Sequence, residues 1–189
     1  MESIRIAEDL EKHFPDSIFE IHVHRGQFSA VVVREAIFEM CQFLKGKQKM
    51  NHLNCLTGVD NLTRKGLHFE RFEVIYQLYS IEFRVGLRLK AQIKDSDYPS
   101  IDSITSLWTG ADWLEREVFD LLGITFNNHP NLKRILTPDS FEGHPLQKTY
   151  KLKGDTEWTG FTKLKEKVRQ LSKFDFHSTQ AQEGNQSDD

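Results

Sequence analysis

The fold is decided by residues 108–150, which read WTGADWLEREVFDLLGITFNNHPNLKRILTPDSFEGHPLQKTY. Their first part predicts a helix of about thirteen residues, because Thr109 can cap its free N–H groups, Asp112 takes the capping-box position and Gly123 follows the last apolar pair as a stop. Apolar residues recur at alternating steps of four and three along this helix, which predicts one buried stripe. The stripe consists of Leu107, Ala111, Leu114, Val118, Leu121 and Leu122.

Another face of this helix carries charges. Asp112, Arg116 and Asp120 recur at steps of four, the spacing at which ordinary helix ion pairs form. Glu115, Glu117 and Asp120 could be read as acid–base catalysts, but consecutive helix positions diverge by about 100°, so Glu115 and Glu117 cannot converge on one substrate atom. We therefore interpret these charges as structural.

Beyond Gly123 the sequence loses its periodicity. Pro130, Pro138 and Pro145 each remove a backbone donor and hold the preceding residue extended, so this arm cannot build a core of its own. It nevertheless carries apolar residues that its own domain or another protein must cover, and we expect neighbouring proteins to cover most of them. They are Phe126, Leu132, Ile135, Leu136, Phe141 and Leu146.

The turn at residues 141–145 is the least ordinary feature of the arm. Gly143 permits a left-handed backbone and Pro145 fixes the exit, so the side chains of Glu142 and His144 are held in defined directions. A catalytic histidine is one interpretation. A docking element is favoured, because no nucleophile or second base lies nearby in the sequence.

Residues from the helix and the arm together form a pattern with fixed spacing. The pattern consists of Glu115-Arg116-Glu117, Asp120-Leu121-Leu122, His129, Lys133 and Ile135-Leu136. It resembles the signature of the 30-kDa subunit of respiratory complex I, the proton-pumping NADH:quinone oxidoreductase. The resemblance continues through 134–137 and 141–146, and more loosely to 72–76 and 174–176. Gln147 departs from it, because the family commonly has a basic residue there.

The resemblance implies a structural and assembly subunit of the peripheral arm of that complex. In this family NADH is oxidised and quinone reduced through FMN and iron–sulfur clusters in partner subunits, and the 30-kDa subunit packs against the subunits that form the quinone cavity and hold the terminal cluster. It implies a peripheral place on the cytoplasmic side of a bacterial inner membrane, or on the matrix side if organelle-encoded. The equivalent subunit of a membrane-bound hydrogenase-type complex is the alternative within the same class.

We expect no catalytic, cofactor-binding or metal-binding residue on this chain. The expected subunit-docking residues come from the signature and from the turn that follows it. They are Glu115, Arg116, Glu117, Asp120, His129, Pro130, Lys133, Arg134, Phe141, Glu142, Gly143, His144, Pro145 and Leu146.

The rest of the sequence predicts an α+β fold: a two-layer α/β domain with a small mixed, largely antiparallel sheet and flanking helices. Helices are expected at 3–13, 35–44 and 161–171, and strands at 19–23, 28–33, 53–59, 69–79 and 83–93. The last strand alternates cleanly and is expected to be antiparallel, with Arg84, Arg88 and Lys90 on a wet face. We expect a domain at 1–123, a docking arm with a basic helix at 124–176, and a disordered tail at 177–189.

Composition excludes several classes of function. A formal net charge of -3 at pH 7 gives no global basic footprint for nucleic acid. Cys41 and Cys55 are too few thiols for an iron–sulfur cluster and suit a reducing compartment. The sequence has no glycine-rich nucleotide loop and no apolar run that could span a membrane, and from the composition of its first residues we expect neither a signal peptide nor a transit peptide.

The histidines leave one alternative of another class. His22 and His24 are expected on one face of a strand and could form half of a zinc site, which His129 and His144 of the arm could complete. Such a site would make the chain a free-standing metal hydrolase. Four hydrogen-bonded or surface histidines are the competing interpretation.

Overall fold

The computed structural model describes residues 2–25, 27–64, 70–151 and 159–171. Its contacts divide the chain into two compact units, Met1–Tyr150 and Lys151–Asp189. The elements are, in order, α1 (Glu2–His13), β1 (Ile18–His24), β2 (Gln27–Val33), η1 (Arg34–Ala36), α2 (Ile37–Gly46), β3 (His52–Asp60), β4 (Phe72–Ser80), β5 (Val85–Ile93), β6 (Ser100–Asp102), α3 (Ala111–Leu122), β7 (Thr125–Asn127) and α4 (Thr159–Leu171).

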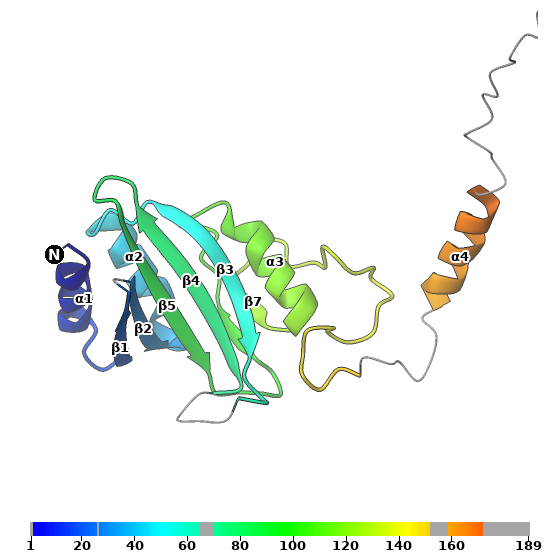
Figure 1. Cartoon of the computed structure of the whole chain (residues 1–189), viewed down its shortest axis with the longest axis horizontal. Helices are drawn as coiled ribbons and strands as arrows, with labels where there is room; N and C mark the ends of the chain where they lie inside the picture. Colours follow the sequence, from blue (N-terminus) through cyan, green and yellow to red (C-terminus); the bar gives the residue numbers. More distant parts are fainter. Residues whose placement is uncertain (1, 26, 65–69, 152–158, 172–189) are drawn as a thin grey trace, which may run out of the picture. The chain divides into compact units, whose positions relative to one another are not determined.

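The first unit is built on a mixed five-stranded sheet with the order β1-β2-β5-β4-β3 (Figure 1). The pairs β1–β2, β3–β4 and β4–β5 are antiparallel, whereas β2 and β5 are parallel. A second, two-stranded sheet joins β6 to β7. The predicted α+β class with a mixed, largely antiparallel sheet is confirmed.

The expectation that β5 is purely antiparallel is wrong. The helix α2 carries the chain back after β2, so that β3 and β5 run in the direction of β2 and β4 runs against it. A single sequence shows that apolar and polar residues alternate along β5, but it does not show which strand lies beside β5. Phe83 and Arg84 also lie outside the strand, in the turn before Val85.

The core lies between one face of this sheet and the helices. The alternation predicted for β5 is confirmed, because Leu87, Leu89, Ala91 and Ile93 are at most 2% exposed. The helix α2 buries its expected stripe completely, and burial of each large apolar side chain contributes about 1.5–3 kcal/mol. That stripe consists of Ile37, Met40, Cys41 and Leu44.

The helix α3 packs against β3 at a glycine. A Cβ atom built on Gly58 would lie 2.5 Å from Cδ1 of Leu122 and 2.9 Å from Cγ1 of Val118, closer than two carbon atoms can approach. The short helix-to-sheet distance therefore depends on the missing side chain. This contact fixes α3, and with it everything that α3 carries.

The predicted start of α3 is wrong and its predicted end is confirmed. Its N-cap is Gly110 without a side-chain hydrogen bond, because tight main-chain turns lead into the helix and Asp112 N–H reaches the carbonyl oxygen of Thr109 instead of its hydroxyl. Gly123 ends the helix in the left-handed conformation, with φ of 77°. Of the predicted stripe, Ala111, Val118 and Leu122 are buried, while the other members are half-buried.

The second unit contains α4, which begins two residues before its predicted start. Its four apolar side chains are 43–57% exposed and lie at the expected helical spacing; they are Phe161, Leu164, Val168 and Leu171. Residues 172–189, including the expected tail at 177–189, lie outside the described residues. None of the helices described is both long and apolar enough to cross a membrane. The boundary at residue 123 stays a prediction, although by its contacts the arm as far as Tyr150 belongs to the first unit.

Candidate docking site

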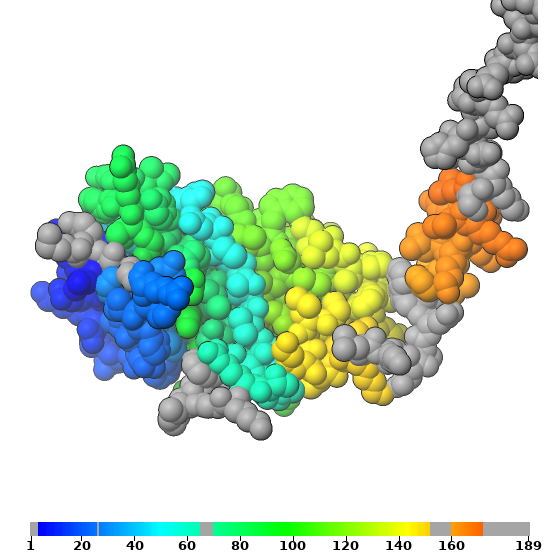
Figure 2. All heavy atoms as spheres, viewed as in Figure 1, coloured from blue at the N-terminus to red at the C-terminus, as the bar shows by residue number. Residues whose placement is uncertain are grey.

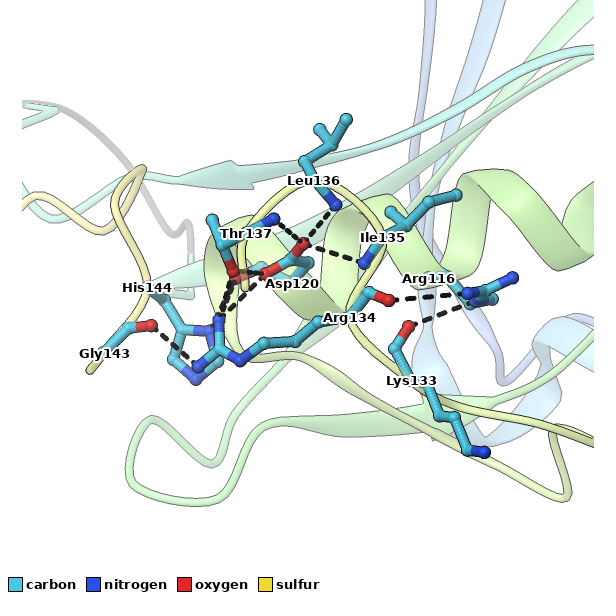
Figure 3. Close-up of polar contacts among 9 residues, drawn as sticks. All are labelled: Arg116, Asp120, Lys133, Arg134, Ile135, Leu136, Thr137, Gly143 and His144. Carbon is cyan, nitrogen blue, oxygen red and sulfur yellow. Dashed lines mark hydrogen bonds and ion pairs between the residues drawn. The ribbon is translucent and has the colours of Figure 1, made fainter. Parts of the chain in front are cut away.

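Asp120, in the last turn of α3, is the centre of the arm's polar contacts (Figure 3). Its carboxylate is completely buried and accepts hydrogen bonds from three consecutive backbone N–H groups, those of Ile135 at 3.0 Å, Leu136 at 2.7 Å and Thr137 at 2.8 Å. The Thr137 hydroxyl also donates to it. One side chain of the helix thus fixes the path of the arm.

Arg134 completes the set of donors around Asp120. Its Nη1 lies 2.8 Å from Oδ1 of Asp120 and 2.9 Å from the Thr137 hydroxyl, and its Nη2 donates to the carbonyl oxygen of Gly143 at 3.0 Å. Burial alone would raise the pKa of Asp120, but the hydrogen bonds from Thr137, Leu136 and Ile135 outweigh it and hold that pKa far below its usual range. The carboxylate is therefore ionised and paired.

The arm also supplies partners for the last carbonyl groups of α3. His144 Nδ1 donates to the carbonyl oxygen of Asp120 at 2.8 Å, the N–H of Leu146 to that of Leu121 at 2.9 Å, and Gln147 Nε2 to that of Leu122 at 2.7 Å. These groups have no partner within the helix itself. The arm therefore acts as the C-terminal cap of α3, and in Figure 2 its yellow atoms adjoin the green and cyan atoms of the domain.

Gly123 makes this arrangement possible in a second way. A Cβ atom on it would lie 2.6 Å from Cδ2 and 2.8 Å from Nε2 of His144. The glycine thus leaves room for the imidazole as well as ending the helix. Gly143 has φ of 80°, as the sequence predicts for the turn before His144.

Asp60, at the end of β3, anchors the far end of the arm. Its side chain is fully buried, and Oδ2 accepts the N–H of Lys148 at 2.8 Å while Oδ1 lies 3.6 Å from Nε of Arg71. Arg71 Nη2 in turn donates to the hydroxyl of Thr149 at 3.3 Å. Nothing in the signature indicates this anchor.

Glu115 and His129 meet near the first turns of α3. Oε1 of Glu115 accepts the N–H of Ile104 at 2.8 Å, whereas Oε2 has no hydrogen-bond partner among the described residues. The N–H of Asn131 donates to Nδ1 of His129, so the proton of this imidazole sits on Nε2, 3.1 Å from Oδ1 of Asp112. Burial raises the pKa of Glu115 to about 7.

The expected ladder of helix ion pairs is wrong. Arg116 donates to the carbonyl oxygens of Lys133 at 3.1 Å and Arg134 at 3.4 Å, while Asp112 faces His129 and Asp120 faces Arg134. The arm folds back over α3, and its groups pair with the three charged side chains that the helical spacing predicts to pair with one another. One signal points to this outcome: an acid in the last turn of a helix opposes the helix dipole and needs a partner from elsewhere.

The expected docking residues divide between structural and exposed positions, and their docking role stays a prediction. Glu115 and Asp120 are buried; Arg116, His129, Arg134, Phe141, His144 and Pro145 are half-buried; Glu117, Pro130, Lys133, Glu142, Gly143 and Leu146 are exposed. The structure brings Asp120, Arg134, Gly143 and His144 together at one end of α3. The sequence interpretation missed Thr137, Gln147 and Asp60.

The arm covers more of its own apolar surface than expected. Phe126 is 2% exposed, because β7 pairs with β6 inside the first unit. Phe141 is half-buried and stacks on Tyr150 at a ring distance of 6.0 Å. Leu136 and Leu146 remain 63% and 55% exposed.

The four histidines do not converge on one site. His22 and His24 lie on β1, at the opposite edge of the sheet from β3 and α3. His129 contacts Asp112 and His144 contacts Asp120, eight positions apart along α3. The metal-hydrolase alternative is therefore wrong about its site, and no other group of metal ligands occurs among the described residues.

The family model described as "Respiratory-chain NADH dehydrogenase, 30 Kd subunit" matches residues 30–156, which include β3, β4, β5, α3 and the arm as far as Tyr150. The chain belongs to this family. Similar members are named as a subunit of NADH-quinone oxidoreductase. That of Geobacter sulfurreducens is 44% identical over 153 residues, which cover 81% of this chain and 92% of the relative. That of Hyphomonas neptunium is 37% identical over 154 residues, 80% of this chain and 73% of the relative.

Solved structures carry the same fold. The trypsin-resistant fragment of Nqo5 aligns with a TM-score of 0.62 and 30% identity over 70% of this chain and 100% of that one. A chain of the membrane-bound sulfane sulfur reductase, an archaeal respiratory membrane complex, aligns with a TM-score of 0.61 over 88% of this chain and 92% of that one. At 20% identity this second likeness concerns the fold alone.

Proposed function

We propose that this chain is a structural and assembly subunit of the peripheral arm of a proton-translocating NADH:quinone oxidoreductase. It packs against the subunits that form the quinone site and hold the terminal iron–sulfur cluster, and FMN and the clusters of those partners carry the electrons. The complex holds it on the cytoplasmic side of a bacterial inner membrane, or on the matrix side of a mitochondrial one. The observation that carries this proposal is the 44% identity over 153 residues to the NADH-quinone oxidoreductase subunit of Geobacter sulfurreducens.

The geometry of the arm supports a docking role. Asp120, His144 and Gln147 hold the arm on α3, so its exposed side chains keep one arrangement before a partner binds. Such pre-organisation lowers the entropy cost of association. Leu136 and Leu146 are exposed on the arm that these contacts hold in place, as the apolar anchor residues of an interface are before assembly.

The test replaces both leucines in the cell that makes the complex. Leu136→Asp with Leu146→Asp should weaken the association of the chain with its complex by at least about a hundredfold, since each buried leucine contributes about 1.5–3 kcal/mol. Thermal unfolding of the purified chain should change little, because both side chains are exposed. Assembly is measured on native gels of solubilised membranes, and activity per assembled complex by NADH:quinone turnover.

The matched control is Ile4→Asp with Phe19→Asp, at side chains 50% and 58% exposed on α1 and β1. It should assemble normally. Normal assembly of the leucine variant contradicts the docking role of the arm. A His144→Ala variant that assembles fully but has lost nearly all turnover contradicts a purely structural role and puts chemistry on this chain.

The equivalent subunit of a membrane-bound hydrogenase-type complex is the second candidate. The shared fold with a chain of the archaeal sulfane sulfur reductase keeps it open. Purification of the tagged chain from solubilised membranes separates the two candidates. A co-purifying large subunit with a nickel–iron centre favours the hydrogenase type, and one without it, in a complex that oxidises NADH, favours the first proposal.

A further inference from the structure

The five-stranded sheet has a second face that the helices of the first unit leave open. Core residues of α1, α2 and α3 pack on the face that carries Leu87 and Leu89 of β5, and Figure 1 looks onto the opposite face. Side chains alternate along a strand, so Arg88 and Lys90 of β5 lie on this open face. These two residues give β5 the basic side that its alternation predicts, and Glu20 of β1 and the buried Glu73 of β4 lie on the same side of the sheet.

A hollow of about 520 Å³ lies at one end of this open face, and we call it the cationic hollow. Its cationic and titratable lining consists of Arg84, Arg88 and His24, and its neutral polar lining includes Gln77, Tyr79 and Asn54. None of the described residues that line it is Asp or Glu. The sign of its charge is therefore opposite to the net charge of -3 of the whole chain.

The two arginines of the hollow are positioned by the strands. Nε of Arg88 donates to Oε1 of Gln77 on the neighbouring strand at 3.0 Å, which orients the guanidinium. Arg84 occupies a turn position with φ of 54°, a left-handed conformation that favours glycine, asparagine or aspartate. Arg84 occupies this position although the left-handed backbone is unfavourable for arginine. Its side chain adds a second guanidinium to the lining of the hollow.

A third arginine lies at the same end of the sheet. Phe28 pairs with Leu87 in the parallel register of β2 and β5, so both strands begin at one end, and Arg25 occupies the turn that leads into β2. Arg25 is exposed. Glu82 is an acid in the turn that carries Arg84, and it does not line the hollow.

We propose that the cationic hollow docks an extended segment of a partner subunit that carries at least two carboxylates. Arginine pairs with carboxylates through parallel charge-assisted hydrogen bonds, and the amide and hydroxyl groups of Gln77, Tyr79 and Asn54 suit the backbone of such a segment. The hollow draws residues from all five strands, from β1 at one edge of the sheet to β3 at the other. This is a width of four strand spacings or roughly 19 Å, which matches several extended residues and not a single small anion. This inference rests on the proposed function, because it requires an assembly, but it concerns a surface separate from the arm.

The test places the photo-crosslinking residue p-benzoylphenylalanine at Ser29, which lines the hollow and pairs with Arg88 in register. The full chain is assembled in cells, the membranes are irradiated, and the crosslinked peptide is identified by mass spectrometry. We expect a segment of one partner subunit with at least two Asp or Glu residues. The same probe at Leu136 reports on the arm in parallel.

Charge variants establish that the arginines hold the segment. Arg84→Asp with Arg88→Glu should lower the crosslinking yield at Ser29 by at least about tenfold, since two charge-assisted contacts become repulsive. Aspartate is chosen at position 84 because it tolerates the left-handed backbone. The matched control makes the same changes on α1, at the exposed Arg5 and Lys12, and should leave the yield unchanged. If the charge-reversal variant is unstable, Arg84→Asn with Arg88→Gln removes the charges alone and should still lower the yield.

Three outcomes overturn the inference: no polypeptide crosslinked at Ser29, a crosslinked segment without Asp or Glu, or an unchanged yield in both arginine variants. If the probe at Leu136 crosslinks to a partner in the same cells, only the cationic hollow is refuted and the proposed function stands. If neither position crosslinks to a partner, the proposed function fails as well.

Discussion

The two ends of α3 carry buried carboxyl groups that behave in opposite ways. Glu115 and Asp120 are each 0% exposed, yet the pKa of Glu115 is raised to about 7 while that of Asp120 is far below its usual range. Glu115 accepts one backbone N–H at Oε1, and its Oε2 has no hydrogen-bond partner among the described residues and lies 3.9 Å from Nε2 of His129, whereas Asp120 accepts five donors. Low exposure by itself therefore does not decide the charge of a carboxyl group. Desolvation, which dominates at Glu115, and the donors aimed at the group, which dominate at Asp120, decide it together.

The two groups predict opposite dependences of stability on pH. The lowered pKa of Asp120 contributes stability at pH values above about 4, the usual value for an unfolded aspartate, and this contribution is lost as the pH falls through the folded pKa. The raised pKa of Glu115 means that the folded chain holds a proton that the unfolded chain has released. Its contribution therefore falls as the pH rises from about 4.5 to about 7, and stays low above pH 7.

The largest effect is expected at Asp120. Asp120→Ala leaves the guanidinium of Arg134 and three backbone N–H groups without their acceptor, and loss of one partner of a buried pair costs about 3–5 kcal/mol. Urea unfolding of the full chain at pH 7 measures it. Asp139→Ala, an exposed acid of the same arm, is the control and should cost less than about 0.5 kcal/mol. Equal costs at the two sites would show that Asp120 does not organise the arm.

The opposite sign is expected at Glu115. Glu115→Gln imitates the protonated acid, and a pKa of about 7 against a usual 4.5 corresponds to about 3 kcal/mol at 1.36 kcal/mol per pH unit, so the variant should be more stable than the wild type at pH 8 by up to that amount. The difference should shrink towards pH 4.5. Unfolding measured between pH 4.5 and 8, with the exposed Glu117→Gln as control, tests this. A loss of stability at pH 8 would mean that the fold favours the ionised carboxylate of Glu115 and does not raise its pKa.

A smaller effect is expected when the charge next to Asp120 is kept and its geometry is changed. Arg134→Lys cannot contact Asp120, Thr137 and Gly143 at once, because lysine lacks the planar fork, so we expect a cost of about 1–2 kcal/mol. Lys133→Arg, at the exposed neighbouring side chain, is the control and should be neutral. If Arg134→Lys left the free energy of unfolding unchanged, only the charge of Arg134, and not the geometry of its guanidinium, would matter.

Periodicity in the sequence predicted the longer helices and strands, but it missed the three-residue strands β6 and β7 and did not show which strands pair. The alternation in β5, the stop at Gly123 and the left-handed Gly143 follow from local rules, and the structure confirms them. The parallel pairing of β2 with β5 is a long-range choice that no local pattern records.

The two carboxyl sites show the same limit. Steps of four between Asp112, Arg116 and Asp120 suit an exposed ladder as well as a buried centre, and the donors that decide between them lie 14–17 positions further along the chain, from Arg134 to Thr137. The spacing therefore paired Asp120 with Arg116, whereas the structure pairs it with Arg134 of the arm.

The most direct test of the role of Asp120 is hydrogen exchange at the three amides that donate to it, those of Ile135, Leu136 and Thr137. In the full chain at pH 7, Asp120→Asn should lower their protection by roughly 10–100-fold, since hydrogen bonds to a charged group are worth about 1.5–3 kcal/mol. Amides at the centre of β4 should change much less. Equal protection of the three amides in wild type and variant would contradict the conclusion that the ionised carboxylate holds the arm in place.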